Sequence, residues 1–145
     1  MSNRRCVAAC LVFLFAGGDA MGSDKAVRNI SVAAVSFVPR KFDLENNAVK
    51  LEKMFRQASA GGAQIAVAPE GILEGYVVNE IIAGKAAVDD MKRVAVEIDS
   101  PMIKRFRKLA RELKMCLVFG FAERVSGDVF NCAVFIDHKG EICGR

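Results

Sequence analysis

The chain has 145 residues, of which 52% are hydrophobic and 26% charged, a composition typical of one soluble globular domain. Its formal net charge is only +4, and the basic residues are spread along the sequence rather than gathered in a tail. This charge does not indicate nucleic acid as a partner, because binding to the phosphate backbone needs a concentrated positive surface.

The first twenty residues have the pattern of a secretory signal peptide. Two arginines precede an apolar run over residues 6–16, and small residues follow up to Ala20. The run is too short to span a bilayer, which needs about twenty apolar residues. We therefore expect residues 1–20 to direct export to the periplasm or the exterior and to make the only membrane contact, with residues 21–29 as a linker. The alternative is a mis-called start whose apolar run packs on a cytoplasmic domain.

From residue 30 the chain alternates between strand and helix patterns. Residues 30–37 are rich in β-branched side chains and end before Pro39, as expected for a buried strand. Asp43 is a suitable N-cap for a helix that ends at Gly61-Gly62. One face of this helix is apolar at steps of four and three: Leu44, Ala48, Leu51, Phe55 and Ala58.

The rest of the chain continues the alternation. Ser100 and Pro101 begin a second helix as cap and first-turn residue. Loops and short helical turns are expected over residues 72–96. The remaining strands are expected over residues 64–68, 115–121 and 129–136, with a hairpin turn at 126–128 and a fifth strand after the turn at 138–140. This order predicts an α/β fold with neighbouring parallel strands and helices on a face of the sheet.

The second helix has an apolar face and a basic face. The apolar side chains, which we expect to point inward, are Met102, Phe106, Leu109 and Leu113. The basic ones are Lys104, Arg107, Lys108 and Arg111. No aromatic residues alternate with the basic ones, so a solvated helix face is favoured over a surface for nucleic acid. Binding to an anionic membrane surface is the third and weakest alternative.

Glu70 is the residue best placed for chemistry. It follows an apolar strand and a proline, at the carboxyl end of the strand, where ligands bind in open α/β sheets. A carboxylate in partly apolar surroundings has a raised pKa and can act as a general base near neutral pH. Judged on position alone, a solvated glutamate at a strand end is the commoner case.

The cysteines and the histidine do not indicate a metal site. Three cysteines follow the predicted cleavage position, Cys116, Cys132 and Cys143, and none has the paired spacing of a zinc or redox site. We expect buried free thiols in strands. His138 lies in a predicted turn beside Asp137, without plausible metal-binding partners. We predict neither a metal nor another cofactor.

Four stretches carry recognisable patterns in a fixed order. The aliphatic run over residues 65–68 ends in Pro69-Glu70-Gly71, with Gly75-Tyr76 shortly after it. The other stretches are the first strand with Asp43 and Asn47, the glycine-bearing run Val118–Arg124, and the run Asn131–Asp137 followed by Gly140 and Gly144. Together they resemble the nitrilase/amidase (carbon–nitrogen hydrolase) superfamily over about residues 30–145.

The resemblance implies a fold, an activity and a site. The fold is the N-terminal part of an αββα sandwich with two sheets face to face. The activity is hydrolysis of a small-molecule amide or nitrile by a Glu-Lys-Cys triad, in which Glu70 matches the glutamate and Tyr76 lies near the pocket. The family's lysine and nucleophilic cysteine fall beyond Arg145, because the three cysteines present match non-catalytic strands.

Three expectations follow from the resemblance to only the N-terminal half of the family domain. The chain alone should be inert and marginally stable or poorly soluble, whereas the full-length protein should form a homo-oligomer, as is usual in the family. The competing hypothesis is an exported, non-catalytic binding module on the same scaffold. The residues present do not distinguish among nitrile, amide, carbamoyl and N-acyl substrates.

Overall fold

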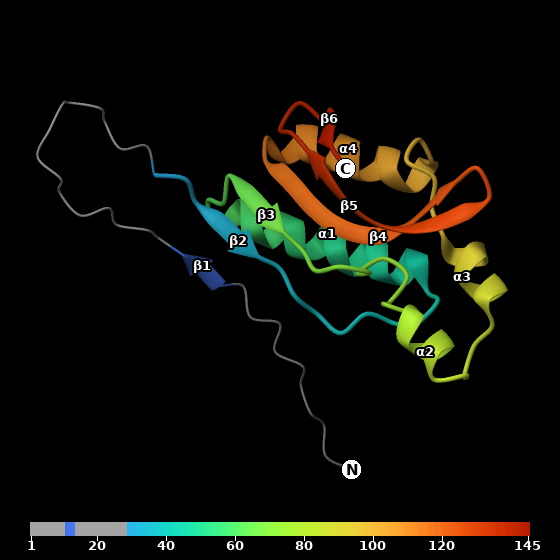
Figure 1. Cartoon of the computed structure of the whole chain (residues 1–145). Coiled ribbons are helices and arrows are strands. Elements are labelled where there is room, and N and C mark those ends of the chain that lie inside the picture. The colour runs from blue at the N-terminus through green and yellow to red at the C-terminus, as the bar shows by residue number, and fades with distance from the viewer. Residues whose placement is uncertain (1–10, 14–28) are drawn as a thin grey trace, which may run out of the picture.

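The computed structural model describes residues 11–13 and 29–145 (Figure 1). The predicted signal peptide and linker lie outside the described residues, apart from the short strand β1 (Leu11–Phe13). β1 pairs antiparallel with β2 through three residue pairs.

The strands form one mixed sheet in which spatial order follows chain order. After β1 come β2 (Val32–Ala34), β3 (Ile65–Val67), β4 (Cys116–Val125), β5 (Asp128–Ile136) and β6 (Ile142–Gly144). β2, β3 and β4 run parallel to one another, and β4, β5 and β6 form an antiparallel meander. The predicted α/β class with a mixed sheet is confirmed.

Two long helices cover one face of this sheet, as predicted (Figure 1). They are α1 (Leu44–Ala60) and α4 (Pro101–Leu113), and both begin at the predicted caps. Asp43 accepts a hydrogen bond from the Asn46 backbone N–H at 3.3 Å, and Ser100 accepts one from Ile103 at 3.4 Å. The short helices α2 (Val78–Ile82) and α3 (Val88–Val94) lie in the connection from β3 to α4, where short helical turns were expected.

The first parallel strands are shorter than the sequence predicts. β2 covers three residues rather than the eight of 30–37, and β3 covers three of the five in 64–68. β2 cannot continue far because its partner β3 ends at Val67, just before Pro69 turns the chain away. β4 is longer than predicted and reaches Val125, because its outer part pairs with β5 over its whole length. The two strands are joined by the two-residue turn Ser126-Gly127. Both turn residues have positive φ, as such hairpins require.

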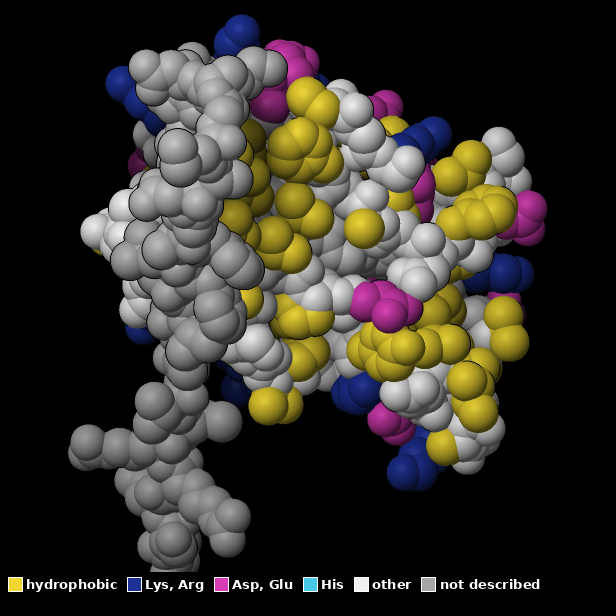
Figure 2. All heavy atoms as spheres, turned by 60° about the vertical axis from the view of Figure 1, so that its left-hand side comes forward, with side chains coloured by type: hydrophobic (Ala, Val, Ile, Leu, Met, Phe, Trp, Pro, Cys, Tyr) yellow, Lys and Arg dark blue, Asp and Glu magenta, His cyan; other side chains and the backbone are white. Residues whose placement is uncertain are grey.

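Burial alternates along the strands and separates the two faces of the sheet. The residues that face α1 and α4 are buried: Ala33, Ala66, Leu117, Phe119, Phe121, Val134 and Ile136. Phe106 of α4 is central to this core, with its ring centroid 4.6 Å from that of Phe119 and 6.2 Å from that of Phe55. The residues that alternate with them are more exposed, and Val67 and Phe135 are 39% and 36% exposed. The sheet therefore has one covered face and one open face, and hydrophobic side chains form a broad area on the surface seen in Figure 2.

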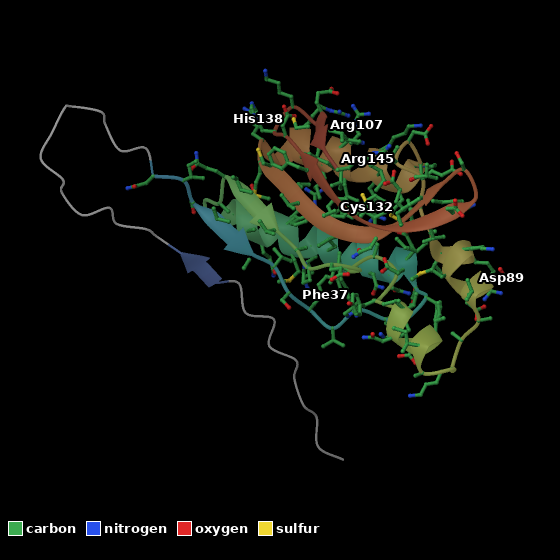
Figure 3. All side chains as sticks on the ribbon, viewed as in Figure 1. Phe37, Asp89, Arg107, Cys132, His138 and Arg145 are labelled. Carbon is green, nitrogen blue, oxygen red and sulfur yellow. The ribbon has the colours of Figure 1, made fainter. Side chains whose placement is uncertain are left out.

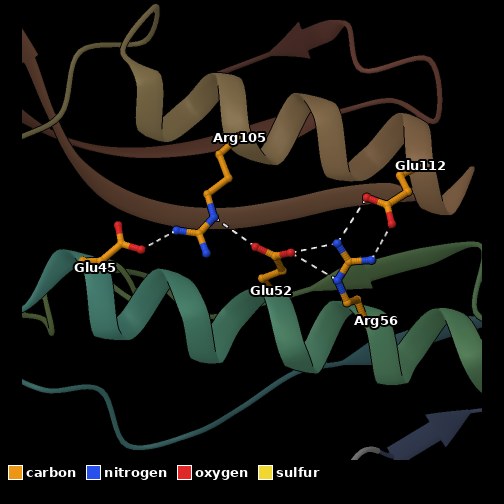
Figure 4. Close-up of polar contacts among 5 residues, drawn as sticks. All are labelled: Glu45, Glu52, Arg56, Arg105 and Glu112. Atoms are coloured by element: carbon orange, nitrogen blue, oxygen red, sulfur yellow. Dashed lines mark hydrogen bonds and ion pairs between the residues drawn. The ribbon is translucent and has the colours of Figure 1, made fainter.

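An ion-pair network joins the outer surfaces of α1 and α4 (Figure 4). Arg105 of α4 lies between two carboxylates of α1, with Nη1 2.7 Å from Glu45 and Nε 2.9 Å from Glu52. Arg56 lies between Glu52 and Glu112, at 2.8 and 2.7 Å. Hydrogen bonds from Arg56 are the main reason why the pKa of Glu52 is lowered. The charges are largely solvated, so the network orients the helices more than it stabilises them.

The basic face of α4 is only partly solvated. Lys104, Lys108 and Arg111 are exposed, as expected. Arg107 is half-buried, because its Nε donates to the Gly140 carbonyl at 2.7 Å and its Nη2 lies 2.8 Å from Glu141. The expectation of a free basic surface is therefore wrong for Arg107, which fastens α4 to the β5–β6 turn. Within residues 29–145, every helix is too short or too polar to cross a membrane.

We predict that Phe106→Ala destabilises the domain by about 3 to 5 kcal/mol, because it removes a fully buried ring and leaves a cavity between α4 and β4. Denaturant unfolding measures the change. Phe130→Ala is the matched control: this ring is 52% exposed, so its loss should change the unfolding free energy by about 0.5 kcal/mol or less. Equal effects of the two substitutions would contradict the assignment of the core.

Candidate functional site

Glu70 lies where the chain leaves the sheet after β3. The Pro69 carbonyl still accepts a hydrogen bond from the Gly120 N–H of β4, at 3.2 Å. Gly71 then has φ +59°, a left-handed conformation that glycine adopts without strain. The chain thus turns away from the sheet at the carboxyl end of β3, as the sequence predicted for Glu70.

Gly120 allows this turn to lie directly against β4. A Cβ atom on Gly120 would stand 2.5 Å from the Glu70 Cα and 2.9 Å from the Gly71 backbone nitrogen. Gly120 has the orientation of residues on the open face, because its neighbours Phe119 and Phe121 point into the helix-covered core. The backbone of Glu70 is therefore held over the open face by direct contact with a strand.

The Glu70 side chain reaches the next strand and contacts Asn131 of β5. Asn131 Nδ2 donates to Glu70 Oε1 at 2.5 Å. Both side chains are exposed, so the described residues do not enclose Glu70 in apolar surroundings. The physical reason is that the open face of the sheet carries no covering layer among residues 29–145.

A second carboxylate, Glu74, lies one turn further along the same loop and is buried. It is only 4% exposed, and its Oε2 accepts a hydrogen bond from the Ala122 N–H at 3.1 Å. Burial raises the pKa of Glu74, and the negative charge of Glu70 acts in the same direction. Backbone N–H groups and Lys41 act against the increase. Glu74 was not predicted from the sequence, although a carboxylate inside the apolar run Ile72-Leu73-Glu74 was a signal for it.

Glu74 also completes the hydrogen bonding of β4. Because β3 is short, the outer half of β4 has no strand beside it on that side. Three N–H groups of this half instead find acceptors outside a strand. The Gly120 N–H donates to the Pro69 carbonyl, and the Ala122 N–H donates to the Glu74 carboxylate. The Arg124 N–H donates to the Val96 carbonyl. An unpaired buried N–H is costly, so the loop that carries both glutamates substitutes for a missing stretch of strand.

Asn47 of α1 ties this loop to the rest of the domain. Asn47 is fully buried, and its Nδ2 donates to the carbonyls of Leu73 and Arg40 at 2.8 and 2.7 Å. Its Oδ1 accepts from the Arg40 N–H at 2.8 Å. The predicted opening unit with Asn47 therefore has a structural purpose, because one amide fixes the segment before α1 to the segment after Glu70.

Tyr76 ends the loop in an unusual conformation. Its φ is +54°, which bulky side chains rarely adopt. Its carbonyl accepts a hydrogen bond from Lys41 Nζ at 3.1 Å, and the same ammonium group lies 3.6 Å from Glu80. The side chain is half-buried on the loop that carries both glutamates.

A hollow of about 480 Å³ lies elsewhere, on the helix-covered side, lined by α1 residues and Arg105.

The cysteines differ from the expectation of buried thiols. All three are free, but Cys143 is exposed and the other two are half-buried. Burial and the nearby carboxylate of Glu123 raise the pKa of Cys132 to about 11, so its thiolate fraction near neutral pH is very small. Glu123 is itself buried and paired with Arg145, and Figure 3 shows Cys132 and Arg145 on the β5–β6 side of the molecule.

A metal-binding cluster is also not formed by residues 29–145. No group of three or more histidine, cysteine, aspartate or glutamate side chains there is arranged to hold an ion. His138 is exposed at the β5–β6 turn (Figure 3). The polar chemistry of the described loop therefore consists of two carboxylates at the end of a parallel strand, the exposed Glu70 and the buried Glu74.

This geometry defines a general class of protein, one with an open α/β sheet and a carboxylate at the end of a strand. Within that class, the family model described as carbon–nitrogen hydrolase matches residues 31–145. The chain therefore belongs to the carbon–nitrogen hydrolase family. The matched region agrees with the residues on which the resemblance to nitrilases and amidases was based.

Comparison with individual proteins gives the same family. The chain is 32% identical over 124 residues to an arylacetonitrilase of Trametes versicolor, covering 78% of this chain and 39% of the relative. It is 31% identical over 129 residues to an N-carbamoylputrescine amidase of Oryza sativa subsp. japonica, covering 89% and 39%. The fold is similar to that of an amidase from Nesterenkonia sp., with a TM-score of 0.58, 22% identity, and 79% and 41% coverage. The chain thus spans about two fifths of the length of these proteins.

We predict that Gly120→Ala destabilises the domain by about 1 to 3 kcal/mol, because the new methyl group overlaps the Glu70 backbone. Gly144→Ala is the matched control, since a Cβ there meets nothing within 4 Å. Urea unfolding of both variants measures the difference. An equally mild effect of both substitutions would show that the Glu70 turn does not rest on β4.

A pH-dependent contribution is predicted for Glu74. Its folded-state pKa is raised above the ordinary value of 4.5, so between the two values the folded chain binds more protons than the unfolded chain. Stability from this group is therefore fully present below about pH 4.5 and is lost as the pH rises through the higher folded-state value.

Glu74→Gln removes this titration. The unfolding free energy of Glu74→Gln minus that of the wild type should increase as the pH is raised from about 4 to about 7. Denaturant unfolding at several pH values measures it, with the exposed Glu141→Gln as control. A difference that does not change with pH would contradict the burial of an ionisable Glu74.

Proposed function

We propose that this chain provides the general base of an enzyme that hydrolyses non-peptide carbon–nitrogen bonds in small-molecule amides or nitriles. The observation that carries the proposal is the placement of Glu70 at the end of β3, with Oε1 held by Asn131, inside the region matched by the family. The arylacetonitrilase and the N-carbamoylputrescine amidase support an amide or nitrile as the substrate class.

The proposed chemistry uses a Glu-Lys-Cys triad. A cysteine thiolate attacks the carbonyl carbon of an amide, or the carbon of a nitrile, whose thioimidate adduct then adds water. The nitrogen leaves as ammonia, taking up the proton held by the glutamate, and a thioester remains. Glu70 takes the thiol proton and later activates water, and a lysine stabilises the developing negative charge on the substrate. The related Nesterenkonia amidase, solved with acrylamide added at its active site cysteine, supports a thiol nucleophile.

In this proposal the lysine and the nucleophilic cysteine lie outside residues 31–145. Cys132 is a poor nucleophile because its pKa is raised to about 11, and Cys143 lies on β6, two strands from β4, on which the Glu70 turn rests. Residues 1–145 alone are therefore proposed to be inert. Tyr76 is proposed to lie near the substrate pocket because it closes the loop that carries Glu70.

Export by residues 1–20 and homo-oligomer formation by the full-length protein are also proposals. The alternative function is an exported, non-catalytic binding module. The DNA that follows the Arg145 codon separates the two hypotheses. A reading frame that continues into a lysine and later a cysteine supports the hydrolase, whereas a stop codon with no remnant of them supports the binding module.

We predict that Glu70→Gln lowers kcat by a factor of about 10² to 10⁴, the usual contribution of a general base. The gene is expressed together with the DNA that follows the Arg145 codon, and ammonia release is measured on a panel of amides and nitriles. Glu80→Gln, a change of a half-buried carboxylate on α2 that is paired with Lys41, serves as control.

Two results would contradict this proposal. Ammonia release that is unchanged in Glu70→Gln would show that Glu70 is not the general base. A wild-type product that releases no ammonia from any amide or nitrile in the panel would favour the binding module.

A further inference from the structure

We infer that Asn131 is a positioning residue for Glu70: its side-chain amide holds one carboxylate oxygen and leaves the other free to take a proton. This inference rests on the proposed function, because it assigns a purpose to Glu70 as a base. Asn131 lies on β5, 61 positions from Glu70 in the sequence.

The contact depends on how β4 and β5 pair. Asn131 is paired with Ala122, and its side chain lies on the open face of the sheet, the face from which Gly120 lacks a side chain. Because Gly120 lets the Glu70 backbone rest on β4, the glutamate side chain needs to cross only one strand to reach β5. Asn131 Nδ2 then meets Glu70 Oε1 at 2.5 Å.

The Ala122–Asn131 pair holds both carboxylates of the loop. The backbone N–H of Ala122 donates to Glu74 Oε2 at 3.1 Å, and the side chain of Asn131 donates to Glu70. The two carboxylates are therefore held by different groups of one residue pair in the β4–β5 ladder. Loss of the Asn131 amide removes the partner of Glu70 and leaves that of Glu74 in place.

An amide is chemically suited to hold a general base. A carboxylate is only an acceptor, so the NH₂ group of the amide must face it. The amide does not titrate, so its donor is present at any pH. It is also neutral, unlike a lysine or arginine, and therefore orients the carboxylate without cancelling the negative charge that attracts a proton.

The test measures the reactivity of each carboxyl group by carbodiimide-activated coupling to glycine ethyl ester, followed by mass spectrometry. The samples are the 145-residue chain, Asn131→Ala and Asn131→Asp. The aspartate variant keeps the shape of the side chain but, when ionised, replaces the donor with a second negative charge, so Asn131→Ala is the variant that removes the donor alone. Fragment ions separate the label on Glu70 from that on Glu74, and the exposed Glu141 is the internal reference.

The expected result is that labelling of Glu70 becomes about ten to a hundred times faster, the effect of losing a hydrogen bond to a charged group. Glu74 should stay protected, since its partner is the Ala122 N–H. Asn79→Ala, which removes an exposed asparagine side chain from α2, should leave the labelling of Glu70 unchanged.

Two results would overturn the inference. Faster labelling of both Glu70 and Glu74 in Asn131→Asp would mean that Asn131 only maintains the strand. Unchanged labelling of Glu70 would mean that the contact does not restrain it. Enzyme activity is not measured, so either result leaves the ammonia-release test of Glu70 intact. Conversely, a gene product that releases no ammonia would not contradict the contact between Asn131 and Glu70.

Discussion

The close contact between the Glu70 turn and Gly120 is the constraint on which the candidate site depends. A side chain at position 120 would overlap the Glu70 backbone, and the turn would then have to move off β4. With glycine there, the turn lies on the sheet, and Glu70 and Glu74 both reach the Ala122–Asn131 pair. The backbone contact comes first, and the side-chain contacts follow from it.

The early end of β3 makes room for that turn. Strands beside a longer β4 would normally satisfy its N–H groups, but β3 ends at Val67. The loop takes over this task with one carbonyl and one carboxylate, from Pro69 and Glu74. The same loop therefore completes a sheet edge and presents a carboxylate, and the buried amide of Asn47 keeps it in place.

The two carboxylates of the loop have different environments for a physical reason. Glu74 points to the edge of β4 and is buried, so its charged form is disfavoured and its pKa is raised. Glu70 points across the open face to Asn131 and is exposed. The open face, where Val67 and Phe135 are partly exposed, has the apolar character of a surface that a further layer covers in a sandwich.

Periodicity and local signals determined much of the fold in advance. The spacing of apolar residues in α1 and α4, their caps at Asp43 and Ser100, and the order of strands and helices were all predicted because they depend on neighbours in the sequence. The motif around Glu70 led to the family for the same reason. The lengths of β2, β3 and β4 were predicted wrongly, because strand pairing depends on distant segments.

Only the tertiary structure brought the site residues together. Glu70, Gly120 and Asn131 lie on three separate segments, and nothing in their spacing indicates that a glycine on β4 lets a carboxylate from β3 reach an amide on β5. The burial of Glu74 likewise depends on a free N–H at Ala122, which exists only because β3 is short. Contacts of this kind depend on the pairing of β3 with β4, two strands that are far apart in the sequence.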